Sequence, residues 1–394
     1  MDRSLPALGA PRWVPLSYLG LAHLGLACAC VVTVRDPSLI AGFFYHPKMI
    51  AVVHALTVGW ISSSLIGVLY LAVGRLGFRA TRLDGWLFVA WATGAGGLAS
   101  HFWIEEVSGM VWSAGLLAIA ILVIAARFGM ALAATDVSAA LKFPLNLAWL
   151  NLLATAFVGF LIGVNKTETI LPGYSLHNVF AHAHLAALGW AFLTVIALAH
   201  LFLLLHAHGP FRAARWNLHG ALLTQVGAAG IFVSLLLGEP YVLGFSAAAL
   251  VGLVLCVGTL VAHARNSRPP LGRAVALPWI LGFLGLVLAA VLGQALLRDV
   301  FGDTEPDWIM AYGVAGLLAG LGSMVLGLMM LWLRRLSVGA ARAWPPVLCW
   351  SIATGLLLAG LTADRHGAIT AGATVLLVAV VWNGRSLLSS ARTG

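Results

Sequence analysis

The residues of this chain with the clearest chemistry are histidines that lie inside long apolar stretches. The pattern His-x4-Gly-Trp occurs twice, as HALTVGW from His54 and as HLAALGW from His184, and His182 stands two residues before the second copy. A histidine inside a lipid-spanning helix is costly, which makes each one a functional hypothesis by default. We therefore expect His54, His182 and His184 to bind a shared cofactor, for which our interpretation is heme.

The elements that position these histidines are membrane spans. The chain of 394 residues is 61% hydrophobic and 9% charged, with mean hydropathy +0.99, whereas a soluble domain carries about 25% charged residues. Runs of about 20 apolar residues are found at 13–35, 49–74, 84–104, 107–128, 142–164, 177–205, 216–237, 241–264, 275–297, 308–333, 345–362 and 367–384. We predict an all-α polytopic membrane helix bundle of about 12 transmembrane helices, forming a single transmembrane domain over residues 1–394.

The two His-x4-Gly-Trp stretches open the second and sixth spans, so the chain is predicted to contain an internal repeat of four helices. The tenth span would then be the third copy. Its corresponding segment, MAYGVAG from Met310, has no histidine, so the third copy is only suggested.

Basic residues sort by loop. With the N-terminus inside, the inner segments hold Arg3, Arg12, Arg75, Arg79, Arg82, Arg127, Lys142, Arg212, Arg215, Arg265, Arg268, Arg273, Arg334, Arg335, Arg342, Arg385 and Arg392. The outer segments hold only Arg35, Lys48, Lys166, Arg298 and Arg365. The positive-inside rule then predicts that both termini are cytoplasmic, in a bacterial inner membrane. The formal charge of +9 therefore reflects topology, and no nucleic-acid partner is expected.

Helical geometry limits what the histidines bind. His182 and His184 point about 200° apart on a helix, so they cannot bind one metal as a pair, but they can serve two centres on opposite sides of it. A hexacoordinate heme iron needs histidines from two facing helices, and His54 with either His182 or His184 would supply them. In the predicted topology all three lie near the outer face.

A second, smaller metal site is predicted at the same face. His101 and Glu105 are four residues apart and would share one helix face, and His177 opens the sixth span. Together they would bind copper or another divalent ion. The alternative is that Glu105 ends its helix in water and pairs with Lys48 or Lys166.

The remaining candidates have simpler interpretations. His200 is expected to be a packing residue, and His263, at an inner helix end, is expected to extend toward the lipid headgroups. Trp60, Trp103 and Trp190 are interpreted as core or interface aromatics, with packing against a porphyrin as the alternative.

The segment AHAHLAALGW from Ala181 resembles the His-x-His helix of heme–copper oxidase subunit I, especially in the cbb3-type and nitric-oxide-reductase branches. In that family the two histidines bind two hemes on opposite helix faces. The segment from His54 resembles a motif of NnrS proteins, twelve-span heme–copper membrane proteins linked to nitric oxide metabolism. The chain departs from the oxidases in lacking a His-His pair and a His-x3-Tyr sequence, which weighs against oxygen reduction and proton pumping.

The sequence thus favours a membrane protein that binds one or two hemes b. It would act in electron transfer, or in binding or turnover of NO or O2 near the periplasmic face. Its partner would be a cytochrome c or another membrane subunit, and an enzymatic role, left open, would be that of a heme-dependent oxidoreductase. Two other hypotheses stay open: a membrane protein that handles copper or another transition metal, and a non-catalytic subunit of a respiratory or photosynthetic complex.

Overall fold

Backbone groups inside a bilayer must be hydrogen-bonded within the protein, and this chain achieves that with helices. The computed structural model describes residues 13–166, 168–206, 214–238, 240–266, 273–302, 305–333 and 344–392. All regular secondary structure in these residues is helical, so the predicted all-α fold is confirmed. Several arginines of the charge argument lie outside the described residues: Arg3, Arg12, Arg212, Arg268, Arg334, Arg335 and Arg342.

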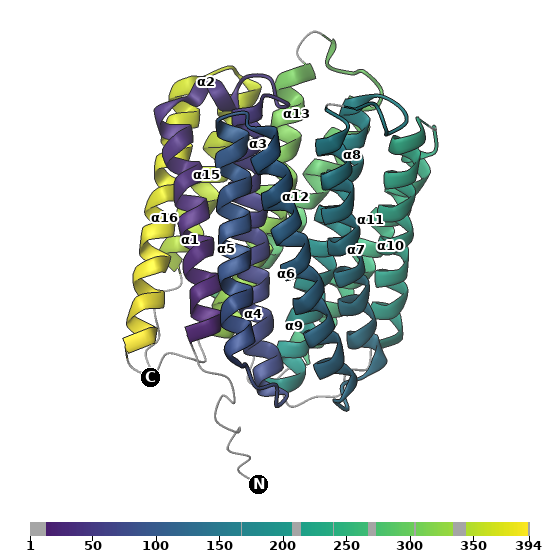
Figure 1. Cartoon of the computed structure of the whole chain (residues 1–394), viewed down its shortest axis with the longest axis vertical. Helices are drawn as coiled ribbons and strands as arrows, with labels where there is room; N and C mark the ends of the chain where they lie inside the picture. The colour runs from purple at the N-terminus through teal and green to yellow at the C-terminus, as the bar shows by residue number, and fades with distance from the viewer. Residues whose placement is uncertain are drawn as a thin grey trace. The chain divides into compact units, whose positions relative to one another are not determined.

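Within the described residues, a helical span lies at each of the twelve predicted positions. Figure 1 shows the helices running side by side. They are α1 (Trp13–Arg35), α3–η1–α4 (Pro47–His54, Ala55–Ser62, Ser63–Arg75), α5 (Arg82–Trp103), α6 (Val107–Ala133), α7 (Ala139–Val164), α8–η2–α9 (Ser175–His184, Leu185–Phe192, Leu193–His206), α10 (Ala214–Leu237), α11 (Val242–Arg265), α12 (Arg273–Leu296), α13–η4–α14 (Glu305–Gly313, Val314–Gly322, Ser323–Leu333), α15 (Trp344–Thr362) and α16 (His366–Arg392). Eleven of them are long and apolar enough to cross a membrane. The other, α5, has 22 residues and carries Asp84 in its first turn.

In the described part of the chain, three of the spans contain a π-helix in their middle. These are the second, sixth and tenth spans, with π segments η1 (Ala55–Ser62), η2 (Leu185–Phe192) and η4 (Val314–Gly322). A π-helix is rare and is often found at functional sites. The three segments recur every fourth span, so the backbone carries the third repeat copy that the sequence only suggested.

The second and third repeats also match in the helix that precedes the π span. Pro144 of α7 and Pro278 of α12 each stand five residues after the start of their helix. Seven residues further on, α7 has Asn151 and α12 has Gly285. Each of these two residues contacts the π segment of its own repeat. The two repeats therefore share one packing plan.

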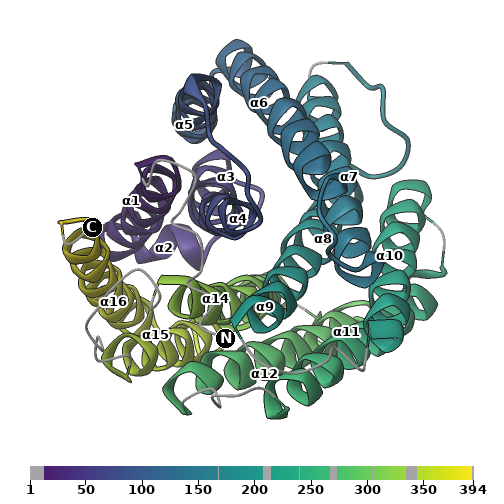
Figure 2. The same ribbon diagram turned by 90° about the horizontal axis from the view of Figure 1, so that it is seen from below.

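Contacts between helices divide the chain into two compact units. Unit 1 comprises Met1–Leu19, Ser63–Ala95 and Ser108–Pro270, and unit 2 comprises Gly20–Ser62, Gly96–Val107 and Leu271–Gly394. In unit 1, α7 packs along the α8–η2–α9 span, and α10 lies beside α11 (Figure 2). In unit 2, α12 packs along η4 and α14, and α15 lies beside α16.

Candidate functional site

His54 stands at the junction between α3 and η1 in unit 2. Its Nδ1 lies 2.8 Å from the carbonyl oxygen of Ile50. Because a carbonyl only accepts, Nδ1 carries the proton and donates, and the lone pair of the ring is on Nε2. The ring stacks on Phe102 of α5, with ring centroids 5.0 Å apart, and it is half-buried.

His184 has the same arrangement in unit 1. It is the last residue of α8, directly before η2. Its Nδ1 donates to the carbonyl oxygen of Phe180 at 2.7 Å, so its basic nitrogen is again Nε2. The ring is half-buried, whereas all residues from 189 to 203 are buried.

This shared geometry suits a metal ligand. Histidines that bind metals almost always donate their other ring N–H to a carbonyl, a carboxylate or water, which fixes the tautomer and the orientation of the ring. His54 and His184 both satisfy this condition with a backbone carbonyl one turn earlier. In each residue, Nε2 is therefore the ring nitrogen that a metal ion would bind.

His182 faces a different neighbour. A Cβ on Gly159 of α7 would lie 2.9 Å from Cε1 of His182, so this glycine leaves room for the imidazole against α7. Since α8 is regular up to His184, the two histidines lie about 200° apart on it. The two side chains thus leave the helix on opposite sides. A ligand role for His182 stays a prediction.

The glycine of the repeated motif is a point of close helix approach. A Cβ on Gly189 would lie 2.5 Å from Cγ of Asn151 in α7. Without it, the Asn151 amide reaches η2 and donates to the Gly189 carbonyl oxygen at 3.1 Å. Asn151 also exchanges two hydrogen bonds with Gln225 of α10, at 2.6 and 3.1 Å. In unit 2, Gly25 of α1 packs in the same way on Gly59 of η1.

The motif tryptophans are core residues. Trp60 and Trp190 are each 2% exposed. Trp60 packs on Trp350 and Trp190 packs on Trp149, each with ring centroids 4.9 Å apart. Trp103 is partly exposed, and the ammonium of Lys48 lies 5.4 Å from its ring centroid.

The structure removes the helix-face argument for the second predicted site, the metal site at the outer end of α5. The prediction that His101 and Glu105 share a helix face is wrong, because α5 ends at Trp103 and Glu105 adopts φ 61° in the turn that follows. There the Glu106 N–H donates to the His101 carbonyl oxygen and the Glu105 N–H to that of Phe102, which is a Schellman helix end. The helix thus uses both glutamates to terminate.

The third proposed ligand of that site, His177, is an exposed residue near the start of α8 in unit 1. Within the described parts of the chain, no group of three or more His, Cys, Asp or Glu side chains is arranged to hold a metal ion. A metal site that includes His101, Glu105 and His177 therefore stays a prediction with no geometric support of its own.

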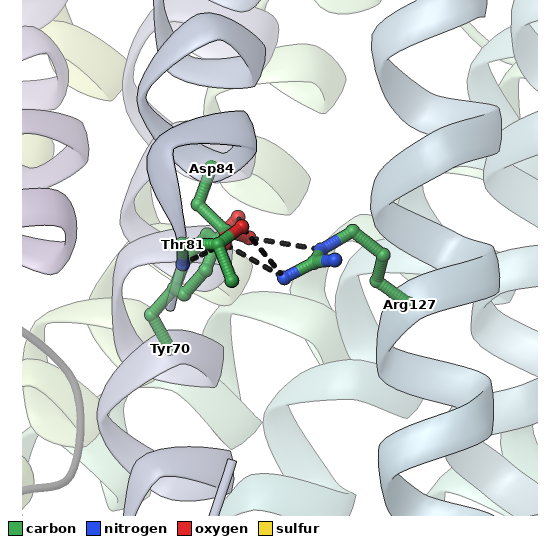
Figure 3. Close-up of polar contacts among 4 residues, drawn as sticks. All are labelled: Tyr70, Thr81, Asp84 and Arg127. Atoms are coloured by element: carbon green, nitrogen blue, oxygen red, sulfur yellow. Dashed lines mark hydrogen bonds and ion pairs between the residues drawn. The ribbon is translucent and has the colours of Figure 1, made fainter. Parts of the chain in front are cut away.

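Sequence reasoning missed a buried ion pair in unit 1 (Figure 3). Asp84 of α5 is fully buried and accepts from Nε and Nη2 of Arg127 in α6, at 3.1 and 2.8 Å. Tyr70 donates its hydroxyl to Asp84 at 2.9 Å, and Thr81 donates its backbone N–H at 2.6 Å. The carboxylate is fully hydrogen-bonded, so we interpret it as a structural link between three spans. Its signal in the sequence was an aspartate inside a predicted span.

A second polar cluster was also missed. His263, expected to extend toward the headgroups, is instead 5% exposed and lies 3.1 Å from His200, measured between the two Nδ1 atoms. The expectation for His263 is therefore wrong, because the ring finds a polar partner inside unit 1. The only sequence signal was the placement of both residues in apolar helices.

Comparison with known proteins adds no family assignment. No protein-family model matches the chain, and no curated protein matches it at a significant level.

Proposed function

We propose that the chain is a membrane protein that binds heme b, with His54, His182 and His184 as its ligand histidines. The observation that carries the proposal is the paired geometry of His54 and His184. Both residues end an α segment directly before a π segment, and both donate Nδ1–H to the preceding turn. Independent recurrence of this arrangement in two units favours a shared chemical role over packing.

The residues fit the group. Imidazole is a common axial ligand of heme iron, and an iron with two imidazoles carries electrons, whereas one with an open position binds a small gas. His54 and His184 are half-buried and lie in apolar helices. Such an environment suits a porphyrin, which is largely apolar. The chain's role would be to fix the ring orientation of its ligands and to exclude water from the iron, in electron transfer or in binding of NO or O2.

The predicted topology indicates on which side of the membrane the heme would lie. The loop distribution of Lys and Arg favours cytoplasmic termini, which would put His54 and His184 toward the periplasmic side of a bacterial inner membrane. A redox partner would then be a cytochrome c or a second membrane subunit. Resemblance of the motif from Ala181 to heme–copper oxidases supports the same proposal.

The test is the pigment content of the purified full chain. We expect a Soret band, and a pyridine hemochromogen spectrum typical of heme b, with one or two hemes per chain. The variant His54→Ala should lose or shift that band, while the matched control His219→Ala, an exposed histidine of α10, should keep it. A colourless protein that copurifies with copper or zinc would favour metal handling, and a colourless protein without metal would favour a non-catalytic subunit. Either result would overturn the heme proposal.

A further inference from the structure

A chain of buried aromatic rings runs through unit 1, from the π segment of the sixth span to the inner half of the second. Trp190 of η2 packs on Trp149 of α7, with ring centroids 4.9 Å apart. Trp149 packs on Phe128 of α6 at 5.8 Å, and Phe128 packs on Tyr70 of α4 at 4.7 Å. Each of these four side chains is at most 6% exposed. The rings therefore form a continuous path of contacts that is shielded from solvent.

One end of this path lies close to a proposed heme ligand. Trp190 follows His184 by six residues in the same span of unit 1, which is no more than about 9 Å along the helix axis at 1.5 Å per residue. Tryptophan and tyrosine are the aromatic side chains that lose one electron most easily, whereas phenylalanine resists oxidation. An oxidant on the His184 side would thus find two tryptophans and then a tyrosine as electron donors, with the Phe128 ring as a spacer before the tyrosine.

The other end of the path has an acceptor for a proton (Figure 3). The Tyr70 hydroxyl donates to Oδ1 of Asp84 at 2.9 Å. A tyrosine that loses an electron while buried must also lose its hydroxyl proton, because a charged ring without a partner is costly away from water. The Asp84 carboxylate can take that proton along the existing hydrogen bond. Tyr70 is therefore a place where an oxidising equivalent can rest as a neutral radical.

The charge that remains after this step has a suitable location. With a proton on Oδ1, Asp84 becomes neutral, and its Oδ2 still accepts from Nη2 of Arg127 at 2.8 Å and from the Thr81 N–H at 2.6 Å. The positive charge then left in the cluster is that of Arg127, which is 19% exposed, whereas Asp84 is fully buried. The charge thus ends on the member of the cluster that reaches the surface.

We propose that Tyr70 and Asp84 form a redox-active tyrosine site that is reached through Trp190 and Trp149. A one-electron oxidant on the His184 side takes an electron from Trp190, which is refilled by Trp149. Trp149 in turn takes an electron from Tyr70. The O–H bond of Tyr70 breaks, its proton forms an O–H bond with Oδ1 of Asp84, and Tyr70 is left as a neutral radical. The natural oxidant rests on the proposed heme function, whereas the path and its end do not.

The test supplies the oxidant by light and needs no heme. Leu150 is 60% exposed and directly follows Trp149 in α7. Leu150→Cys, in a chain with Cys28→Ala and Cys349→Ala, takes a ruthenium photosensitiser, because the other two native cysteines are buried. A flash with a soluble electron acceptor then generates the ruthenium oxidant on the full chain in lipid nanodiscs. Freezing and electron paramagnetic resonance with deuterated tyrosine should show a neutral tyrosyl radical that is coupled to an exchangeable proton.

Three variants test the steps one by one. Tyr70→Phe keeps the ring without the hydroxyl, Asp84→Asn keeps an acceptor oxygen that cannot take the proton, and Trp149→Phe keeps a ring that resists oxidation. Each should lose the tyrosyl signal. The matched control is Tyr241→Phe, which changes an exposed tyrosine of unit 1 and should keep the signal.

Four outcomes would overturn the proposal. A tyrosyl signal that persists in Tyr70→Phe would place the radical on another tyrosine, and one that persists in Trp149→Phe would exclude the path. Persistence in Asp84→Asn, or a wild-type radical without the exchangeable proton, would exclude Asp84 as the acceptor, and the wild-type measurement decides this even if the variant fails to fold. Tryptophan radicals alone in the wild type would mean that the rings are core packing. A colourless protein would overturn the heme proposal and leave this test unchanged.

Discussion

The second and third repeats have the same backbone plan but different chemistry. In the second repeat, the ring of His182 rests on Gly159 of α7. In the third, the ring of Tyr312 rests on Gly293, the corresponding residue of α12, with a Cβ there 3.2 Å from Cε2. In both repeats the proline lies at the same position of the first helix and the next span contains a π segment. The ring on the corresponding glycine is an imidazole in the second repeat and a phenol in the third. The two repeats thus share their backbone architecture and differ in the side chain that rests on the corresponding glycine.

The helix–π contact shows the same contrast. Asn151 forms a polar contact with η2 through the Gly189 carbonyl. Its counterpart Gly285 has no side chain, and α12 approaches η4 closely there. A Cβ on Gly285 would lie 2.5 Å from the backbone of Ala319 and Gly320. Small residues permit close approach of helices in membranes, and buried amides add hydrogen bonds between them. At this position the histidine-bearing copy has a side-chain hydrogen bond, and the other copy has a close approach of two backbones.

The largest expected difference between the two copies is spectroscopic. If His184 is the axial ligand proposed above, His184→Ala should abolish or strongly shift the heme absorption, because the variant would lack the axial nitrogen. Tyr312→Ala, at the corresponding end of the tenth span, should leave a heme spectrum in place. Absorption spectra of the two purified variants check this. Equal loss in both would mean that the third repeat also supplies a ligand, so the two repeats would not differ in this chemistry.

The first repeat contains the buried ion pair of Asp84 and Arg127, and breaking it should cost the most stability. Asp84→Ala leaves Arg127 with no carboxylate, and loss of one partner of a buried pair costs about 3–5 kcal/mol. Because Arg127 is 19% exposed, we expect the lower end of that range. Equilibrium unfolding in mixed micelles measures it. A loss below about 1 kcal/mol, the value of a surface pair, would show that the link is not structural.

The glycines at the two contacts should respond alike. Gly189→Ala and Gly285→Ala each place a Cβ within 2.5 Å of the facing helix, and overpacking of this kind costs about 1–3 kcal/mol. Gly316→Ala is the matched control, because its Cβ would meet only Ala289 at 3.5 Å. Thermal unfolding of the three variants ranks them. A control as unstable as the other two would refute the close-approach explanation.

The smallest effect is the coupling between Asn151 and Gln225 of the second repeat. Interhelical hydrogen bonds in membranes contribute about 0.6 kcal/mol on average and up to about 1.7 kcal/mol. A double-mutant cycle with Asn151→Ala and Gln225→Ala should give a coupling in this range. A coupling near zero would mean that the polar contact adds nothing to the packing of α7 on η2.

Much of the fold was predictable from apolar run lengths, because a bilayer fixes both the length and the hydrogen bonding of a span. All twelve spans were found in this way. The π segments were not, since a change from i→i+4 to i→i+5 hydrogen bonding leaves no mark on hydropathy. For that reason the third repeat, with Gly313 at the position of His184, was only suggested by the sequence and was recognised from the backbone.

The candidate ligand residues were chosen from the sequence, whereas the contacts that orient them come from the structure. His54 and His184 were singled out because charge and polarity are costly in lipid, but their bonds to Ile50 and Phe180 depend on local helix geometry. The i,i+4 argument for Glu105 failed because the helix ended two residues earlier. Asp84 and Arg127 are 43 residues apart, so their pairing follows from tertiary packing alone.

The central claim is that Nε2 of His54 and Nε2 of His184 bind heme iron. Pulsed electron paramagnetic resonance of the ferric protein, with 15N-labelled histidine, reads the nitrogen nuclei bonded to the iron. We expect an imidazole coupling in the wild type that is lost or halved in His54→Ala and in His184→Ala and unchanged in His219→Ala. If both variants lose the coupling from the same iron signal, His54 and His184 bind one heme. If they lose it from separate signals, each histidine binds a different heme. A wild-type iron without imidazole coupling, or a coupling that persists unchanged in both variants, would contradict the claim.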